Sequence, residues 1–263
     1  EFGDDRLTEI TDSTHDLSVE DLSTEEDRVV TISHGDYAKT QTLSDYQAQR
    51  RGGTGRSATA VKDEDFVEHL LIASTHATIL CFSDLGKVYW LKVFHIPLAS
   101  RNARGRPMVN LLPLDEGERI TSILPVEGYE EGHFIFMATA RGIVKKTDMQ
   151  QFARQRSVGL RALELEADDW LVGTAVTDGS CDVMLLSSEG KAVRFQEQAV
   201  RAMGRTARGV RGIKLGDEHR LISLIVPQAD STILTVSEKG YGKRTDTAEF
   251  PCKGRGTKGV IAM

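Results

Sequence analysis

A hairpin signal that recurs about every 50 residues constrains this 263-residue chain more than any other feature. It consists of a Ser or Thr, a short turn with a glycine, and a strand that carries Lys or Arg. The turn glycines are Gly35, Gly86, Gly142, Gly190 and Gly240, which lie 51, 56, 48 and 50 residues apart. Glycine supplies the positive φ that a tight hairpin needs. The chain is therefore predicted to be a repeat protein whose units stack on one another.

Short apolar runs rich in β-branched and aromatic residues surround these hairpins, and few stretches have helical period with caps. The predicted strands are 29–33, 70–74, 79–83, 87–94, 120–126, 134–139, 143–146, 171–176, 183–187, 192–195, 221–226 and 232–236. The predicted class is all-β. A unit of about 50 residues with roughly four strands is typical of a propeller blade.

A basic, glycine-rich loop follows every hairpin. The five loops read QRRGGTGR from residue 49, RNARGRP from 101, RQRSVGLR from 154, GRTARGVRG from 204 and KGRGTKG from 253. Four of them lead into an acidic turn, at 63–65, 115–118, 164–169 and 217–218. Circular stacking of equivalent units would place all basic loops on one rim and the acidic turns elsewhere.

The charge distribution supports this arrangement. The net charge is −6, but residues 1–28 hold eleven acidic and two basic residues, which leaves 28 acidic and 31 basic residues in the other 235. The windows 49–56, 101–106, 154–161, 201–214 and 253–258 contain 17 Lys and Arg and no acid. We expect an acidic linker or N-terminal arm over 1–28, with a short helix near Ser18, and a folded domain over 29–263.

The composition of the loops favours phosphate as their ligand. Arginine offers a planar fork of donors that suits phosphate oxygens, and glycine lets backbone amides approach an anion. Aromatic residues, which would stack on single-stranded bases, are absent from the loops. Contacts to a duplex that bends round the rim are therefore predicted, with little base readout. The alternative interpretation is that these loops are solvated hairpin ends with scattered salt bridges.

The sequence offers little for catalysis. It has no GxxxxGK[ST], GxSxG or HExxH motif, and its seven histidines have no ligand spacing. The segment 254–259 matches GxGxxG but lacks a following helix and a downstream acid. We expect no catalytic site, metal or cofactor in this chain. Its three cysteines, Cys81, Cys181 and Cys252, are expected to be reduced and mostly buried in strands of a cytosolic protein.

The remaining features concern the core and the location. No signal peptide or membrane span is expected, since the first 28 residues are polar and no apolar run is long enough. Six aromatic residues are predicted to pack in the core: Tyr89, Trp90, Phe94, Phe134, Phe136 and Phe195.

Several motifs closely resemble one family, the C-terminal domain of the A subunit of bacterial DNA gyrase. QRRGGTGR resembles its signature box, usually QRRGGKG, with Thr54 where lysine is usual. Further matches are FGDDRLTEI at 2, ARGRPMVNLLPL at 103, FMATARGIVKKT at 136, VMLLSSEGKAVRF at 183, VRAMGRTARGVRGIKL at 200 and GYGKRT at 240. The resemblance covers essentially the whole chain. The related topoisomerase IV protein usually has a degraded box or none, so the intact motif favours gyrase.

The resemblance implies a β-pinwheel, a propeller-like disc of four-stranded blades that exchange strands. Six blades are typical and five repeats are visible here. It also implies a non-catalytic domain that wraps double-stranded DNA in a positive sense, so that a bacterial, cytoplasmic A2B2 enzyme can introduce negative supercoils. Its partners would be the remainder of the gyrase A protein and the gyrase B protein, where ATP and Mg act, and the isolated domain would be a monomer.

Two sets of residues are predicted to contact DNA. The box set is Gln49, Arg50, Arg51, Gly52, Gly53, Thr54, Gly55 and Arg56. The rim set is Arg101, Arg104, Arg106, Arg154, Arg156, Arg161, Arg201, Arg205, Arg208, Arg211, Lys253, Arg255 and Lys258. The alternative functions are a propeller scaffold for protein partners, a propeller enzyme, and the equivalent domain of topoisomerase IV.

Overall fold

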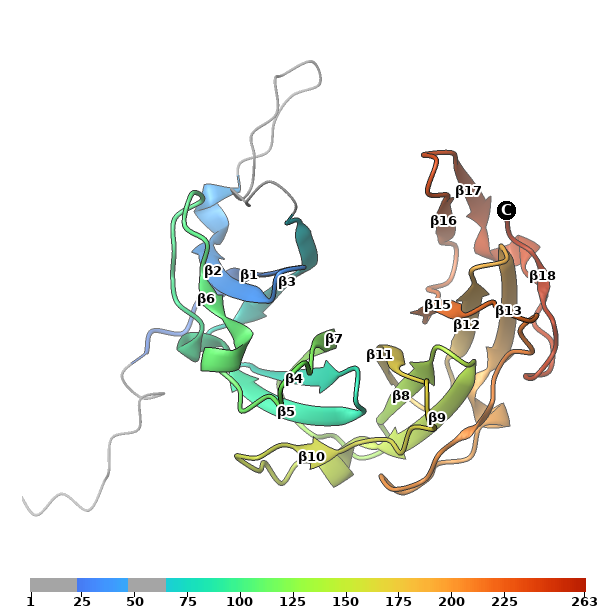
Figure 1. Ribbon diagram of the computed structural model, residues 1–263, viewed down its shortest axis with the longest axis horizontal. Helices are drawn as coiled ribbons and strands as arrows, with labels where there is room; N and C mark the ends of the chain where they lie inside the picture. Colours follow the sequence, from blue (N-terminus) through green and yellow to red (C-terminus); the bar gives the residue numbers. More distant parts are fainter. Residues whose placement is uncertain (1–22, 47–64) are drawn as a thin grey trace, which may run out of the picture.

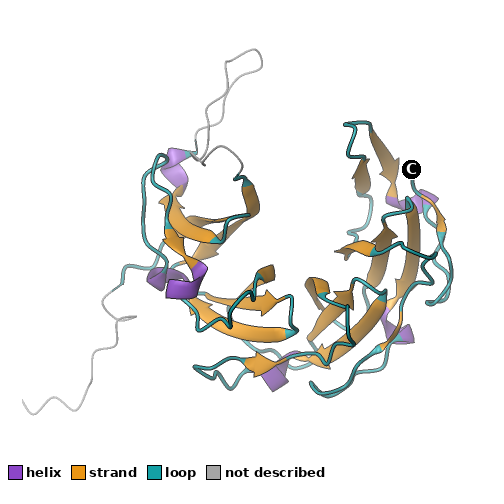
Figure 2. Ribbon diagram, in the orientation of Figure 1, coloured by secondary structure: helices purple, strands orange, loops and turns teal. Residues whose placement is uncertain are grey.

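The computed structural model describes residues 23–46 and 65–263 (Figures 1 and 2). The proposed helix near Ser18 and the whole box set therefore lie outside the described residues. The longer strands are β1 (Asp27–Ser33), β2 (Tyr37–Thr42), β3 (Val67–Ser74), β4 (Thr78–Ser83), β5 (Lys87–Lys92), β7 (Ile120–Val126), β8 (Phe134–Thr139), β9 (Ile143–Asp148), β11 (Leu171–Thr177), β12 (Asp182–Ser187), β13 (Lys191–Gln196), β15 (Leu221–Ile225), β16 (Thr232–Val236) and β17 (Gly242–Asp246). The all-β prediction is confirmed.

Four two-residue strands and six short 3-10 helices complete the described elements. The strands are β6 (Arg106–Pro107), β10 (Leu160–Arg161), β14 (Val210–Arg211) and β18 (Val260–Ile261). The helices are η1 (Leu43–Asp45), η2 (Val93–His95), η3 (Met108–Asn110), η4 (Met149–Phe152), η5 (Glu197–Ala199) and η6 (Thr247–Glu249). Within the described residues, no helix has the length and apolar character needed to cross a membrane.

The sheets follow one another round an open arc, with the two-stranded β16–β17 sheet at one end and the β1–β2–β3 sheet at the other (Figure 1). Their orders are β3-β1-β2-β6, β7-β4-β5-β10, β11-β8-β9-β14 and β15-β12-β13-β18. In each, one repeat supplies an inner strand and a hairpin, and the next repeat supplies the fourth, outer strand. This is strand exchange between neighbouring blades, as the resemblance implies.

The hairpin turns form where the glycine signal predicts them, with one exception. Gly86, Gly142, Gly190 and Gly240 have φ between 72° and 80°. In the first unit Asp36, not Gly35, takes the left-handed position, with φ 59°. The prediction of Gly35 as the turn residue is therefore wrong by one residue, because Asp also tolerates this conformation when a turn requires it.

Apolar clusters fill the space between successive sheets. One cluster joins the first and second sheets around Ile32, Ile79 and Tyr89, and the next joins the second and third around Phe82 and Phe152. Tyr89, Phe136 and Phe195 are fully buried as predicted, whereas Trp90, Phe94 and Phe134 are only partly buried. Each blade thus depends on its neighbours for its core.

The cysteine prediction holds in part. All three thiols are free, but only Cys81 is buried within a strand. Cys181 is partly exposed just before β12, and Cys252 is exposed.

The strand predictions miss two kinds of element. The second hairpin strands β2 and β17 were not among the predicted ranges, although the hairpin signal covers both. The four exchanged strands are too short for an alternating pattern. The fifth sheet also departs from the four-stranded expectation. Within residues 23–46 and 65–263 it consists of β16 and β17 alone, and Leu234 and Val236 stay 67% and 62% exposed.

Candidate nucleic-acid interface

Strand exchange places the basic loops along the outer edges of the sheets. After η2, the chain runs beside the preceding hairpin in parallel, with Leu98 opposite Thr40. It then forms the loop and returns antiparallel as the short outer strand, where Arg106 pairs with Ala38. The same pattern brings Ala202 beside Lys146 and Cys252 beside Arg194. Figure 1 shows β6, β10 and β18 on the outside of the arc.

One glycine in each of these four loops makes the close approach possible. Gly105, Gly159, Gly209 and Gly259 have φ between 75° and 102°. A Cβ at any of them would lie 2.4–2.5 Å from the preceding hairpin, against main-chain oxygens in three units and the Tyr89 ring in the other. Glycine is required here by both conformation and space.

The hairpin turn itself anchors the end of each loop. The carbonyl of Gly142 accepts hydrogen bonds from the amides of Gly212 and Ile213, at 2.8 and 3.3 Å. The carbonyls of Gly86 and Gly190 accept equivalent pairs, and that of Asp36 accepts one from Met108. The loops are thus held at equivalent points on successive blades, which supports the predicted regular rim.

Most side chains of the rim set point to solvent. Its exposed members are Arg104, Arg106, Arg154, Arg156, Arg161, Arg201, Arg208, Arg211, Lys253, Arg255 and Lys258. Arg101 and Arg205 are partly exposed. Lys214, in the same loop window but not in the predicted set, is exposed as well.

The rim charges remain largely unneutralised. Among ion pairs between described residues, Arg208 is the one member of the rim set with carboxylate partners, Glu164 at 3.8 Å and Glu166 at 3.6 Å. Arg104 lies over the ring of Tyr37 at 3.6 Å. Cations held on aromatic faces or main-chain oxygens keep their charge available to an anion.

The basic loops of the fourth and fifth units also touch each other. Gly256 N donates to Gly212 O at 2.6 Å, and Lys214 N donates to Thr257 O at 2.8 Å. Arg255 Nη1 donates to Arg211 O at 3.0 Å. The loop of the fifth unit therefore rests directly on that of the fourth.

The acidic turns lie beside the hairpin tips, not within the basic loops. Asp169 Oδ1 accepts the amide of Arg141 at the third tip, at 2.9 Å. Asp65 does the same for Gly35 at the first tip, at 2.8 Å. In the second unit, Lys87 pairs with Asp115, and this hydrogen bond raises the pKa of Lys87. The acids of these turns therefore serve structural roles at the tips.

Sequence reasoning missed two buried lysines beneath the loops. Lys39 and Lys145 are 3% and 0% exposed, and their ammonium groups donate to main-chain oxygens of the basic loops. The sequence signal was a lysine in the middle of a hairpin strand, between Ala38 and Thr40 in one case and between Val144 and Lys146 in the other. That signal does not separate a buried lysine from an exposed one, because the two strand faces are not distinguished by an alternating pattern in these short segments.

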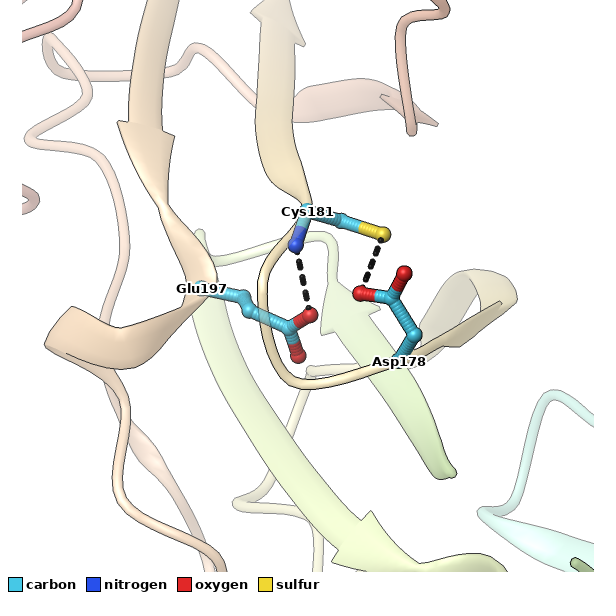
Figure 3. A group of neighbouring side chains, drawn as sticks. All are labelled: Asp178, Cys181 and Glu197. Carbon is cyan, nitrogen blue, oxygen red and sulfur yellow. Dashed lines mark hydrogen bonds between the residues drawn. The ribbon is translucent and has the colours of Figure 1, made fainter. Parts of the chain in front are cut away.

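One group of possible metal ligands lies beside the start of β12 and η5 (Figure 3). Asp178, Cys181 and Glu197 bring their ligand atoms within 4.8 Å of one another. Glu197 is fully buried, and its carboxylate already accepts from the Cys181 amide at 2.9 Å and from Thr177 Oγ1 at 2.7 Å. Lys146 Nζ lies 3.5 Å from the same carboxylate, so an ordinary ion-pair network accounts for this group.

Known proteins resemble this chain over its whole length. The family model described as DNA gyrase C-terminal domain, beta-propeller, matches residues 27–74, 77–127, 133–178, 182–228 and 231–263, one match for each unit. The A subunit of DNA gyrase from Salmonella typhimurium is 58% identical, and its counterpart from Escherichia coli K12 is 56% identical. Both alignments cover 100% of this chain and 30% of the relative, so the chain spans about three tenths of these proteins.

Solved structures agree with the fold. A DNA gyrase A C-terminal domain superposes with a TM-score of 0.75 at 24% identity, over 89% of this chain and 76% of that one. The C-terminal domain of DNA topoisomerase IV superposes with a TM-score of 0.73 at 28% identity, over 90% and 73%. The five family matches coincide with the five structural units, and on this basis the chain belongs to the DNA gyrase C-terminal domain family.

Proposed function

We propose that this chain binds duplex DNA along its outer edge and wraps it, without strong sequence preference. The observation that carries the proposal is the row of four acid-free basic loops within the described residues, which strand exchange fixes at the same point of successive blades round an arc. A duplex that follows such a row must bend, so affinity depends on phosphate contacts and on the deformability of the DNA.

The proposed setting is the gyrase holoenzyme. The chain would act beside the remainder of the gyrase A protein and the gyrase B protein in a bacterial cytoplasmic A2B2 complex, where wrapping directs strand passage toward negative supercoils. Membership of the gyrase A family supports this setting. We assign DNA binding to this chain, and we assign cleavage, ATP hydrolysis and their cofactors to the remainder of the enzyme.

Ligation of nicked circular DNA in the presence of the chain tests wrapping. We expect a positive linking-number shift that grows with protein concentration and shrinks in an Arg106→Ala, Arg211→Ala variant. The matched control is Arg141→Ala, Lys239→Ala, which removes the same charge from two hairpin tips and should keep the shift. DNA binding without any shift would reject wrapping, and salt-insensitive binding of a protein partner without DNA affinity would favour a scaffold.

The salt dependence gives a second readout of the same proposal. If about 6 to 10 phosphates are contacted, the affinity should fall roughly 10³- to 10⁵-fold between 50 and 200 mM salt. A fall of less than tenfold in fluorescence anisotropy with a labelled duplex would contradict a rim of this size.

A further inference from the structure

Two buried lysines lie at the same position of two hairpins, directly under basic loops. Lys39 Nζ donates to the main-chain oxygens of Ser100, Arg101 and Ala103, at 3.3, 2.9 and 2.9 Å. Lys145 Nζ donates to Ala162 O at 2.6 Å and also to Arg205 O. Each ammonium is thus enclosed by oxygens of the loops that carry the rim arginines.

Neither ammonium has an ordinary ion-pair partner. Among the described residues, no carboxylate lies within ion-pair distance of Lys39 or Lys145, although both side chains are buried. A buried charge is costly unless hydrogen bonds satisfy it. Main-chain oxygens of the basic loops are the acceptors here, so the loop conformation and the burial of the ammonium depend on each other.

We propose that Lys39 and Lys145 are positioning residues for DNA binding, each holding the main chain of a basic loop so that its arginines face the duplex. The proposal rests on the proposed function above. A loop already fixed in its binding conformation loses less entropy when phosphates dock. Lys39 would serve the loop of Arg104 and Arg106, and Lys145 the loop of Arg205 and Arg208.

The chain offers its own comparison at the equivalent positions. In the second and fourth units the residue is Tyr89 or Val193, and the glycine of the next loop packs against it. These loops are held by apolar contact instead of an ammonium. In the fifth unit the equivalent residue is Lys243, which is exposed and holds no described loop. Lys243 is therefore a matched control for loss of charge alone.

The protonation of Lys145 provides a test without mutation. Burial, and then the nearby charge of Arg205 on the loop that it holds, lowers the pKa of Lys145 to about 8. As the pH rises through this value the ammonium loses a proton and its positive charge. The neutral amine keeps two N–H donors, but its hydrogen bonds to Ala162 O and Arg205 O are no longer charge-assisted and hold the loop less strongly. Between pH 8 and the ordinary lysine value of about 10.5, the unfolded chain holds more protons on Lys145 than the folded chain does. Over this range a rise in pH therefore increases the free energy of unfolding, while we expect DNA binding to weaken.

The experiment measures the slope of log affinity against log salt for a labelled duplex, with the whole 263-residue chain. Each phosphate contact contributes about 0.9 to the slope. We expect Lys39→Met and Lys145→Met each to reduce the slope by about 2, because a loop with several arginines is released, while Lys243→Met changes it by at most about 1. For each variant, circular dichroism checks that the chain is folded, and hydrogen exchange of the loop amides shows whether the loop is still held.

The outcomes separate the two proposals. The role of the lysines would be overturned if Lys39→Met and Lys145→Met changed the slope no more than Lys243→Met does. This holds whether or not the loop amides exchange faster in the two variants. Should the Met variants fail to fold, the wild-type slope at pH 7 and pH 9.5 decides the role of Lys145, since an equal slope at both would refute it. If the wild type shows no salt-dependent DNA binding at all, it is the proposed function that fails.

Discussion

Removing both members of the buried Lys146–Glu197 pair should destabilise the chain by much less than the sum of the two single removals. The two side chains are 7% and 0% exposed, with Nζ 3.5 Å from the carboxylate. Lys146 comes from β9 of one blade and Glu197 from the 3-10 helix η5 of the next, so the pair joins two blades. Glu197→Met leaves the Lys146 ammonium buried without a carboxylate, beside the Phe134 ring at 4.8 Å.

The expected magnitude follows from these contacts. Breaking a buried pair costs about 3–5 kcal/mol in the free energy of unfolding, and replacing both partners by apolar groups is often close to neutral. The double variant Lys146→Met, Glu197→Met still leaves Thr177 Oγ1 and the Cys181 amide without their hydrogen-bond acceptor. Each lost hydrogen bond lowers the free energy of unfolding by up to about 1–3 kcal/mol. The two single effects sum to about 6–10 kcal/mol and the double effect is about 2–6 kcal/mol, so the middle of these ranges gives a coupling energy of about 4 kcal/mol.

Urea unfolding of the wild type, both single variants and the double variant measures this cycle. Tryptophan fluorescence and far-UV circular dichroism follow the transition, and an unchanged m value confirms that the same surface unfolds in each protein. In thermal scans each single variant should lose about 6–20 °C in Tm. If the two single effects add up to the double effect within about 0.5 kcal/mol, the pair is not coupled and the reasoning is wrong.

Two further predictions concern the glycines and the thiols. Gly209→Ala should lower the free energy of unfolding by about 1–3 kcal/mol and weaken DNA binding, because it strains a positive φ and presses on Val144 O at 2.5 Å. Gly204→Ala, with open space around it, is the control; equal Tm values for the two would contradict the argument. In the native protein Cys252 should react with a thiol reagent within minutes at pH 8, whereas Cys81, whose pKa burial raises to about 12, should react only after unfolding. Peptide mapping that finds Cys81 labelled first would refute this.

The sequence predicts the repeat because each hairpin carries its signal within a few residues. Turn chemistry at Gly86 or Gly142 is local, so the positions of the hairpins are correct. Asp36 shows the limit, since glycine and aspartate stand side by side and either can adopt the left-handed conformation. The exchanged strands were missed because pairing of two residues depends on the neighbouring blade, not on their own periodicity.

The composition of the candidate interface could be predicted from the sequence, but the buried lysines that hold its loops could not. Clusters of arginine without acid are visible in the sequence, and the structure places the described clusters on the outer edge. Burial of Lys39 and Lys145 could not be predicted, because lysine is ordinarily a surface residue and its acceptors here lie about 60 residues away in the loops. Long-range hydrogen bonds of this kind leave no local pattern.

The exchanged outer strand also sets the order in which the blades can be completed during synthesis. The first sheet begins at Asp27 and receives its last strand at Arg106–Pro107, so about 80 residues must be made before its edge is covered. At roughly 5–20 residues per second this takes about 4–16 s. The same interval applies to β4 with β10, β8 with β14 and β12 with β18. During that time the outer edge of each nascent hairpin is unpaired and can pair with strands of other chains. The segment that finally covers this edge is the end of the loop that carries the rim arginines and lysines.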